Sequence, residues 1–289
     1  MLDEKKIINR FISYVKIDSQ SDPYSNETPS TKKQWNIANK LVQDLNEIGL
    51  SDVSIDKNAY IYATLPSNIN RKCPTIGFIS HFDTSPDFSG TKINPQIINN
   101  YDGGDITLNK KKNIILSSEY FNEIKQYKGQ TIITTDGNTL LASDDKAGVM
   151  AIINGYATLK KLGIVPSVNI KFFFEGEEEA GSPNLEQILN KYQSTLSSDL
   201  WIICDGPVHQ SSKKQLVMGV RGDTHLELTV FGPKRPLHSG HYGNWVLNPA
   251  MELARLLASM KNEKGEITIK GFYDDVTPLI AAEKKALSK

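Results

Sequence analysis

The chain contains 289 residues, in which 33 lysines and arginines balance 33 aspartates and glutamates. At roughly 150 residues per domain, this length predicts about two domains and excludes a small disulfide scaffold. The balanced charge excludes a global cationic field of the kind that attracts nucleic acid or an anionic membrane, so we expect neither as a partner.

The sequence favours a cytoplasmic location. Its two cysteines, Cys73 and Cys204, lie in apolar stretches and form no disulfide framework, which fits a reducing compartment. The N-terminal segment carries charges every few residues and lacks the apolar run of a secretory signal. The longest apolar runs, such as residues 200–204, are far shorter than the roughly 20 residues that cross a bilayer.

Hydrophobic periodicity predicts two amphipathic helices at the start of the chain, over residues 2–15 and 35–48. Strands and helices then alternate. The expected strands are 75–80, 168–174 and 200–204, and the expected helices are 147–162 and 184–196. This alternation predicts an α/β fold with a mostly parallel, mixed sheet that helices cover on both faces.

The pattern changes near residue 216. The elements expected beyond this point are an alternating strand over 224–231, a helix over 250–260 and a strand near 266–272, with a loop rich in Gly, Pro and His after the first strand. Such elements are typical of a smaller α+β unit. We therefore predict two domains, residues 1–215 and 216–289.

A histidine or acidic side chains follow each strand of the predicted sheet or begin its central helix. They are His81 and Asp83, Asp144 and Asp145, Glu175 to Glu179, and Asp205. In an open parallel sheet, sites form in the crevice beyond the carboxyl ends of the strands. We therefore expect these four loops to converge.

So many carboxylates in one crevice repel one another, and burying an uncompensated charge costs several kcal/mol. One imidazole with several carboxylate oxygens suits zinc, with manganese or cobalt as substitutes. Two metals that share a bridging carboxylate would offset more charge than one and would hold a carbonyl beside its attacking water. We therefore favour a site with two metals.

Each of these motifs alone also has a purely structural explanation. His81 can be a hydrogen-bonded core histidine, Asp144 and Asp145 can cap the following helix, and residues 177–179 can form an exposed acidic loop. Four such loops at matching strand ends are hard to obtain from capping alone. Their joint placement favours the site.

Residues 77–148 contain three motifs that resemble the peptidase T branch of the dinuclear-zinc exopeptidase family. These are residues 77–90 (GFISHFDTSPDFSG), 94–106 (NPQIINNYDGGDI) and 137–148 (GNTLLASDDKAG). Five later motifs are more similar to carnosinase-type dipeptidases of the same family: residues 175–182, 205–207, 221–222, 237–240 and 248–250. The chain looks composite, and both resemblances imply a zinc exopeptidase fold.

The resemblance implies a set of metal ligands. His81 and Asp205 would bind one zinc ion, Asp144 would bridge two zinc ions and Glu179 would bind the second. Family members have a second, smaller domain, called the lid, and take a further histidine ligand from residues that follow it. No histidine of this chain stands in a similar sequence context. We therefore expect a C-terminally truncated chain whose second zinc site is incomplete. A fragment with little activity, a half completed by another polypeptide and an enzyme with one zinc ion all stay open.

The resemblance also implies catalytic and substrate-binding residues. Glu178 would be the general base, and Asp83 would hold the imidazole ligand in position. The second domain would be part of a lid and dimerisation domain, in which His238 and Asn248 contact the substrate. A turn at His238 is the structural alternative, and a homodimer through the lid is the partner expected besides a short peptide.

The leading hypothesis is a zinc-dependent tripeptide aminopeptidase that releases the N-terminal residue of short peptides. One alternative is a dipeptidase or N-acyl-amino-acid amidohydrolase of the same family. Another is an inactive metal-binding or dimerisation protein. Paired carboxylates also occur in glycosidases, but the element formed by His81 and Asp83 has no role there.

Overall fold

The computed structural model of the chain describes residues 3–209, 211 and 213–288. The chain divides into two compact units, residues 1–213 and 214–289. Among the described residues, the helices are all too short or too polar to cross a membrane.

The first unit is built on a five-stranded sheet with the strand order β1-β2-β8-β3-β9. Its strands are β1 (Ser51–Ile55), β2 (Ile61–Leu65), β3 (Thr75–His81), β8 (Asn169–Glu175) and β9 (Leu200–Ile203). The strands β8, β3 and β9 run parallel, and β1 and β2 are antiparallel to their neighbours. The predicted α/β fold with a mixed sheet is confirmed.

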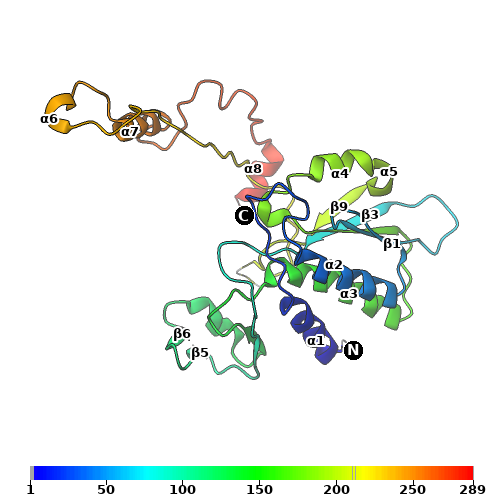
Figure 1. Ribbon diagram of the computed structural model, residues 1–289. Coiled ribbons are helices and arrows are strands. Elements are labelled where there is room, and N and C mark those ends of the chain that lie inside the picture. The colour runs from blue at the N-terminus through cyan, green and yellow to red at the C-terminus, as the bar shows by residue number, and fades with distance from the viewer. Residues whose placement is uncertain (1–2, 210, 212, 289) are drawn as a thin grey trace. The chain divides into compact units, whose positions relative to one another are not determined.

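Helices cover both faces of this sheet (Figure 1). They are α1 (Glu4–Val15), α2 (Gln34–Glu47), α3 (Ser143–Lys161), α4 (Leu185–Lys191) and α5 (Gln193–Leu196). The helix expected over 184–196 is thus divided at Tyr192, whose backbone angles (φ −107°, ψ 25°) are not helical.

The alternation of side chains along β8 explains why the sheet is covered twice. Phe172 and Phe174 point into the core that α2 and α3 complete, whereas Phe173 packs on the opposite face with residues of α4 and α5. All three phenylalanines are buried. Burying each of them stabilises the fold by about 1.5–3 kcal/mol relative to leaving it exposed. The two cores therefore hold the central strands in place.

An extension that the sequence did not predict separates β3 from α3 (Figure 1). It contains two antiparallel strand pairs, β4 (Gln96–Ile98) with β7 (Ile132–Thr134) and β5 (Ile106–Asn109) with β6 (Ile114–Leu116), and the 3₁₀ helix η1 (Asn122–Tyr127). Its strands have only three or four residues, which is too short for a periodic pattern to stand out.

The second unit contains α6 (Ser239–Tyr242), α7 (Pro249–Ser259) and α8 (Ala281–Leu287). Helix α7 matches the helix expected over 250–260. The strands expected over 224–231 and 266–272 are wrong. Among the described residues, 224–231 form no β-ladder, and 266–272 contribute only an isolated bridge between Ile267 and Lys261. An alternating pattern alone makes no strand, because the backbone N–H and C=O groups need a partner strand.

Close packing of β3 against β9 predicts that Gly77 tolerates no side chain. A Cβ atom at this position would overlap the indole ring of Trp201. We expect Gly77→Ala to lower the free energy of unfolding by about 1–3 kcal/mol, because the ring must move in a packed layer. Urea unfolding followed by circular dichroism measures this change.

The matched control is Gly155→Ala, in the exposed face of α3, where a Cβ atom meets nothing within 4 Å. Alanine favours the helix by about 1 kcal/mol over glycine, so this variant should be as stable as the parent or more so. Equal unfolding midpoints for both variants would contradict the tight contact between β3 and β9.

Candidate metal centre

His81 is the centre of the site. It is the last residue of β3, its side chain is 2% exposed, and its Cα lies in register with that of Glu175 at the end of β8. Its Nε2 atom lies 3.2 Å from Asp144 Oδ1, 3.5 Å from Asp205 Oδ2 and 3.8 Å from Glu178 Oε2. Three loops thus bring carboxylates to one imidazole nitrogen, at the carboxyl end of the parallel strands.

Asp83 determines the orientation of this ring. Its carboxylate is fully buried and lies 3.2 Å from His81 Nδ1, which also faces the Asp83 backbone oxygen at 3.2 Å. With two acceptors beside it, Nδ1 carries the hydrogen and donates, which leaves Nε2 to face the other carboxylates. The same Asp83 carboxylate accepts hydrogen bonds from the backbone N–H groups of Glu178 and Glu179, at 3.2 and 3.1 Å. Asp83 therefore ties the ring to the loop that follows β8.

The adjacent residues Asp144 and Asp145 have opposite environments. The side chain of Asp144 is 75% exposed, whereas Asp145 is 5% exposed. Asp145 accepts hydrogen bonds from the Ser80 hydroxyl, from the His81 N–H at 3.4 Å and from the Gly148 N–H at 3.0 Å. Both oxygens of Asp145 are therefore used to join β3 to α3, and Asp144 is the carboxylate that is free to bind a ligand.

The other three ligands expected from the sequence, Asp144, Glu179 and Asp205, lie around His81. The imidazole forms one group with Asp144 and Glu179, and another with Asp145 and Asp205; the ligand atoms within each group lie within 4.8 Å of one another. We favour Asp205 over Asp145 as the ligand in the second group, because protein donors already occupy Asp145. The roles of these residues as ligands remain predictions.

Burial and mutual repulsion raise the pKa values of three carboxylates in the site, those of Glu178, Glu179 and Asp205. Burial raises the pKa of Glu179 to about 7, and nearby carboxylates, chiefly that of Asp144, add to the effect against the opposing influence of His81. Burial raises the pKa values of Glu178 and Asp205 as well, again against His81. Burial and crowding thus disfavour the ionised forms of these carboxylates, and a nearby positive charge would favour them.

The histidine supplies only part of the missing positive charge. Burial acts to lower the pKa of His81, but its hydrogen bond with Asp83 and the surrounding carboxylates raise it to about 10. In the described parts of the chain, the ion pairs of Asp144, Glu178 and Asp205 are with this imidazole, and no lysine or arginine joins them. One imidazole and several uncompensated carboxylates are a donor set that suits a divalent cation.

Sequence reasoning assigned no role to two buried polar residues behind the site, Glu175 and Lys146. Glu175 is 5% exposed, accepts a hydrogen bond from the Ser182 hydroxyl at 3.0 Å, and has its pKa raised to about 7 by burial. Lys146 is fully buried and donates to the backbone oxygen of Ile17 at 2.7 Å, and burial lowers its pKa to about 7. These residues belong to the motifs already noted, but only their contacts distinguish them from the residues that face the cation.

The two other residues expected at the site, His238 and Asn248, lie in the second unit. His238 Nδ1 accepts from the Gly240 N–H at 3.1 Å, and Asn248 Oδ1 accepts from the Ala250 N–H at 2.9 Å. Each is therefore the N-cap of a helix, α6 and α7 respectively. Both line a pocket of about 600 Å³ within this unit. A contact with substrate stays a prediction for both.

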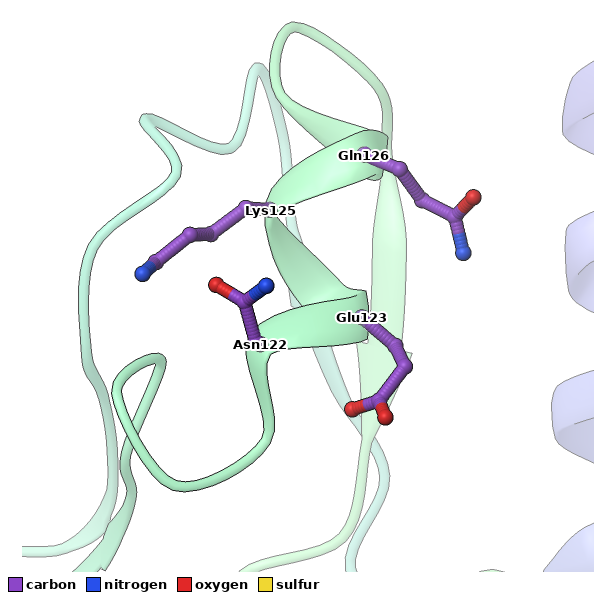
Figure 2. A pocket seen from close by; sticks show the side chains of 4 residues that line it. All are labelled: Asn122, Glu123, Lys125 and Gln126. Carbon is purple, nitrogen blue, oxygen red and sulfur yellow. The ribbon is translucent and has the colours of Figure 1, made fainter. Parts of the chain in front are cut away.

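A pocket of about 590 Å³ lies on η1, away from the His81 cluster. Figure 2 shows that the side chains of Lys125 and Gln126 extend from the 3₁₀ helix in opposite directions, and Glu123 turns away from Asn122. The polar groups around this hollow do not converge on a common point. These four side chains therefore form no catalytic or metal-binding arrangement in this pocket.

The contrast between the two neighbouring aspartates generates a prediction. We expect Asp144→Asn to weaken zinc binding while leaving the urea unfolding midpoint of the metal-free chain unchanged. We expect Asp145→Asn to lower the free energy of unfolding by about 1–3 kcal/mol even without metal, because buried donors lose a charged acceptor. Isothermal titration with zinc and urea unfolding of both variants make the comparison. Equal effects of the two substitutions in both measurements would refute this division of roles.

Comparison with known proteins places these motifs in a family. The model of peptidase family M20/M25/M40 matches residues 140–284. A protein named Peptidase T from Clostridium acetobutylicum is 54% identical over 177 residues, which are 61% of this chain and 43% of that protein. Peptidase T from Geobacillus thermodenitrificans is 49% identical over 178 residues, or 62% of this chain and 43% of the relative. The chain thus spans less than half the length of these curated relatives.

Solved structures share the fold at low sequence identity. An M20 family metallo-carboxypeptidase from Sulfolobus solfataricus, Sso-CP2, matches with a TM-score of 0.65 and 21% identity, over 98% of this chain and 56% of the other. Human carnosine dipeptidase 1 matches with a TM-score of 0.58 and 21% identity, over 99% of this chain and 56% of the other. The family match covers half of the chain and includes the segments that carry Asp144, Glu178 and Asp205. The chain belongs to peptidase family M20/M25/M40.

Proposed function

We propose that this chain carries the catalytic centre of a zinc-dependent tripeptide aminopeptidase, which hydrolyses short peptides and releases their N-terminal residue. The observation that carries the proposal is the group of carboxylates around His81 Nε2. Proteins named Peptidase T share about half of the aligned residues, over 61% and 62% of this chain, and this identity supports the choice of substrate.

The metal ligands that we propose are His81, Asp144, Glu179 and Asp205. Their donors are one imidazole nitrogen and carboxylate oxygens, which zinc binds at tetrahedral sites. Two zinc ions with Asp144 as the bridge would use all four residues. When bound, the metal polarises the scissile carbonyl and offsets the negative charge that develops on it.

Glu178 is the general base of the proposed reaction. Its carboxylate is about half exposed, its backbone N–H is held by Asp83, and its pKa is raised, chiefly by burial. A carboxylate with a raised pKa can accept the proton of the attacking water near neutral pH and then pass it to the leaving amine. Asp83 contributes by keeping the ring of His81 in one orientation.

Substrate binding and assembly involve the second unit in this proposal. His238 and Asn248 contact the peptide from the lid domain, and the same domain forms a homodimer interface. Support for these roles comes from the motifs around the two residues, which resemble those of carnosinase-type dipeptidases. A panel of tripeptides, dipeptides and N-acetyl amino acids tests the substrate class. Turnover of the dipeptides or N-acetyl amino acids without turnover of tripeptides would replace the aminopeptidase with the alternative that it identifies.

Replacing the proposed base tests the mechanism. We expect Glu178→Gln to lower kcat for a tripeptide by about 100- to 10,000-fold, because the amide cannot accept the proton. The zinc content should stay equal to that of the parent. The matched control is Glu186→Gln, at an exposed position of α4, which should leave kcat unchanged. A Glu178→Gln variant as active as this control would exclude Glu178 as the base.

Removal of the metal tests the requirement for a cation. Chelation should abolish tripeptide hydrolysis by the full chain, and added zinc should restore it, because in the described parts of the chain the imidazole of His81 is the only positive partner of these carboxylates. Metal content measured by atomic emission should follow activity through both steps. Undiminished hydrolysis by the metal-free chain would show that the reaction needs no metal.

A further inference from the structure

The segment from Ile17 to Gln34 contains none of the proposed ligands, yet it contacts three of the loops that carry them. Its backbone oxygen at Ile17 accepts from Lys146, which follows the two aspartates of α3. The Ser19 hydroxyl donates to the backbone oxygen of Phe82 at 2.7 Å, next to His81. The end of the segment contacts the loop that follows β8, residues 176–182, here called the acidic loop.

Gln34 makes the most extensive of these contacts. It is the first residue of α2, and its side chain is fully buried. Its Nε2 donates to the backbone oxygen of Gly176 and, at 2.8 Å, to Glu177 Oε1. Its Oε1 accepts from the Thr31 N–H at 2.7 Å. The nitrogen and the oxygen of the amide thus both have hydrogen-bond partners, and both acceptors of the Nε2 atom belong to the acidic loop.

Glu177 depends on these contacts. It is 1% exposed, and its Oε1 also accepts from the Ser30 N–H at 2.6 Å. Its Oε2 has no hydrogen-bond partner among the residues that the structure describes. Among the residues that the structure describes, every donor to the Glu177 carboxylate therefore comes from residues 30–34. Without Gln34, the buried carboxylate of Glu177 and the carbonyl of Gly176 would each lose a hydrogen-bond donor. A buried polar group that loses its partner destabilises the arrangement around it.

The position of Gly176 and Glu177 in the chain gives these contacts a meaning for the site. Glu178 and Glu179 follow directly, and their N–H groups are bound by Asp83 on the other side. The acidic loop is therefore held at two successive points: Gln34 binds the residues before the proposed base, and Asp83 binds the base and the residue after it. Displacement at the first point shifts the carboxylates that face His81.

We propose that Gln34 is a positioning residue for the metal centre: its buried amide holds Gly176 and Glu177, and thereby places Glu178 and Glu179 toward His81. This inference rests on the function proposed above for those two glutamates. The residue touches neither substrate nor metal, so it acts only through the acidic loop. Residues that hydrogen-bond directly to metal ligands typically change metal affinity by about 10- to 100-fold. Gln34 acts through residues adjacent to Glu178 and Glu179, so we expect an effect near the lower end of that range.

The test uses the full chain loaded with Co²⁺, whose visible spectrum reports the ligand geometry. We expect Gln34→Ala to raise the dissociation constant for Co²⁺ about tenfold and to change the spectrum. In the tripeptide assay it should lower kcat by a similar factor with KM little changed. The matched control is Gln43→Ala in the same helix, because the side chain of Gln43 is exposed and donates to Glu47, one turn along α2. This control should behave like the parent.

A paired exchange separates positioning from a general loss of stability. Gln34→Glu places a carboxylate against Glu177 and should weaken Co²⁺ binding further than Gln34→Ala. The double variant Gln34→Glu with Glu177→Gln restores one hydrogen bond with its direction reversed, and should recover most of the Co²⁺ affinity lost in Gln34→Glu. This comparison stands even where Gln34→Ala does not fold.

Two results would overturn the inference. One is a Gln34→Ala variant with the Co²⁺ affinity and spectrum of the Gln43→Ala control. The other is a double variant that binds Co²⁺ no better than Gln34→Glu. If the parent binds Co²⁺ but hydrolyses no tripeptide, the proposed function fails while the Co²⁺ titrations still decide the role of Gln34. A parent that binds no Co²⁺ refutes both.

Discussion

Repulsion among carboxylates at the end of a parallel sheet is the constraint on which the site depends. Two like charges about 4 Å apart repel by about 4 kcal/mol at the effective dielectric constant of a protein surface. A domain is stable by only about 5–15 kcal/mol, so several such pairs threaten the fold unless a cation compensates them. The strands β3, β8 and β9 bring the carboxylates together because their carboxyl ends share one edge. Protonation or metal binding must then reduce the negative charge.

The acidic residues of the site fall into two kinds, buried carboxylates that bind other parts of the chain and exposed carboxylates that they hold in position. Asp83, Asp145 and Glu177 are buried, and donors within the chain occupy them. Asp144 and Glu178 are exposed enough to reach a ligand. Each of these two stands next to a buried carboxylate in the sequence. A carboxylate anchored by N–H groups thus holds a neighbour whose own oxygens are free, which allows a metal site to be placed accurately on loops.

Much of this arrangement could be predicted from the sequence. His81 and Asp205 follow apolar runs that were expected to be parallel strands, so their meeting at one edge follows from the topology of the sheet. The resemblance named Asp144 as the ligand, but the residue pattern gives no physical reason to choose it over Asp145, because the two residues are chemically identical neighbours. Only the contacts of Asp145 with Ser80 and Gly148 distinguish them. The role inferred for Gln34 was equally hidden, because a helix pattern records apolar positions and says nothing of one buried amide.

The second unit shows that a hydrophobic pattern predicts a helix more reliably than a strand. The helix α7 was expected and is present, since a helix satisfies its own backbone hydrogen bonds. The alternating pattern over 224–231 was expected to be a strand, but a strand needs a neighbour that the described residues do not supply. Substrate contacts for His238 and Asn248 therefore rest on the resemblance of their motifs, and not on an observed geometry.

Anomalous diffraction at the zinc absorption edge, from crystals of the full chain grown with zinc, tests the central claim most directly. The account predicts an anomalous peak within coordination distance of His81 Nε2 and of the carboxylates of Asp144, Glu179 and Asp205. Crystals in which zinc occupies other positions, while this group of carboxylates binds none, would contradict it.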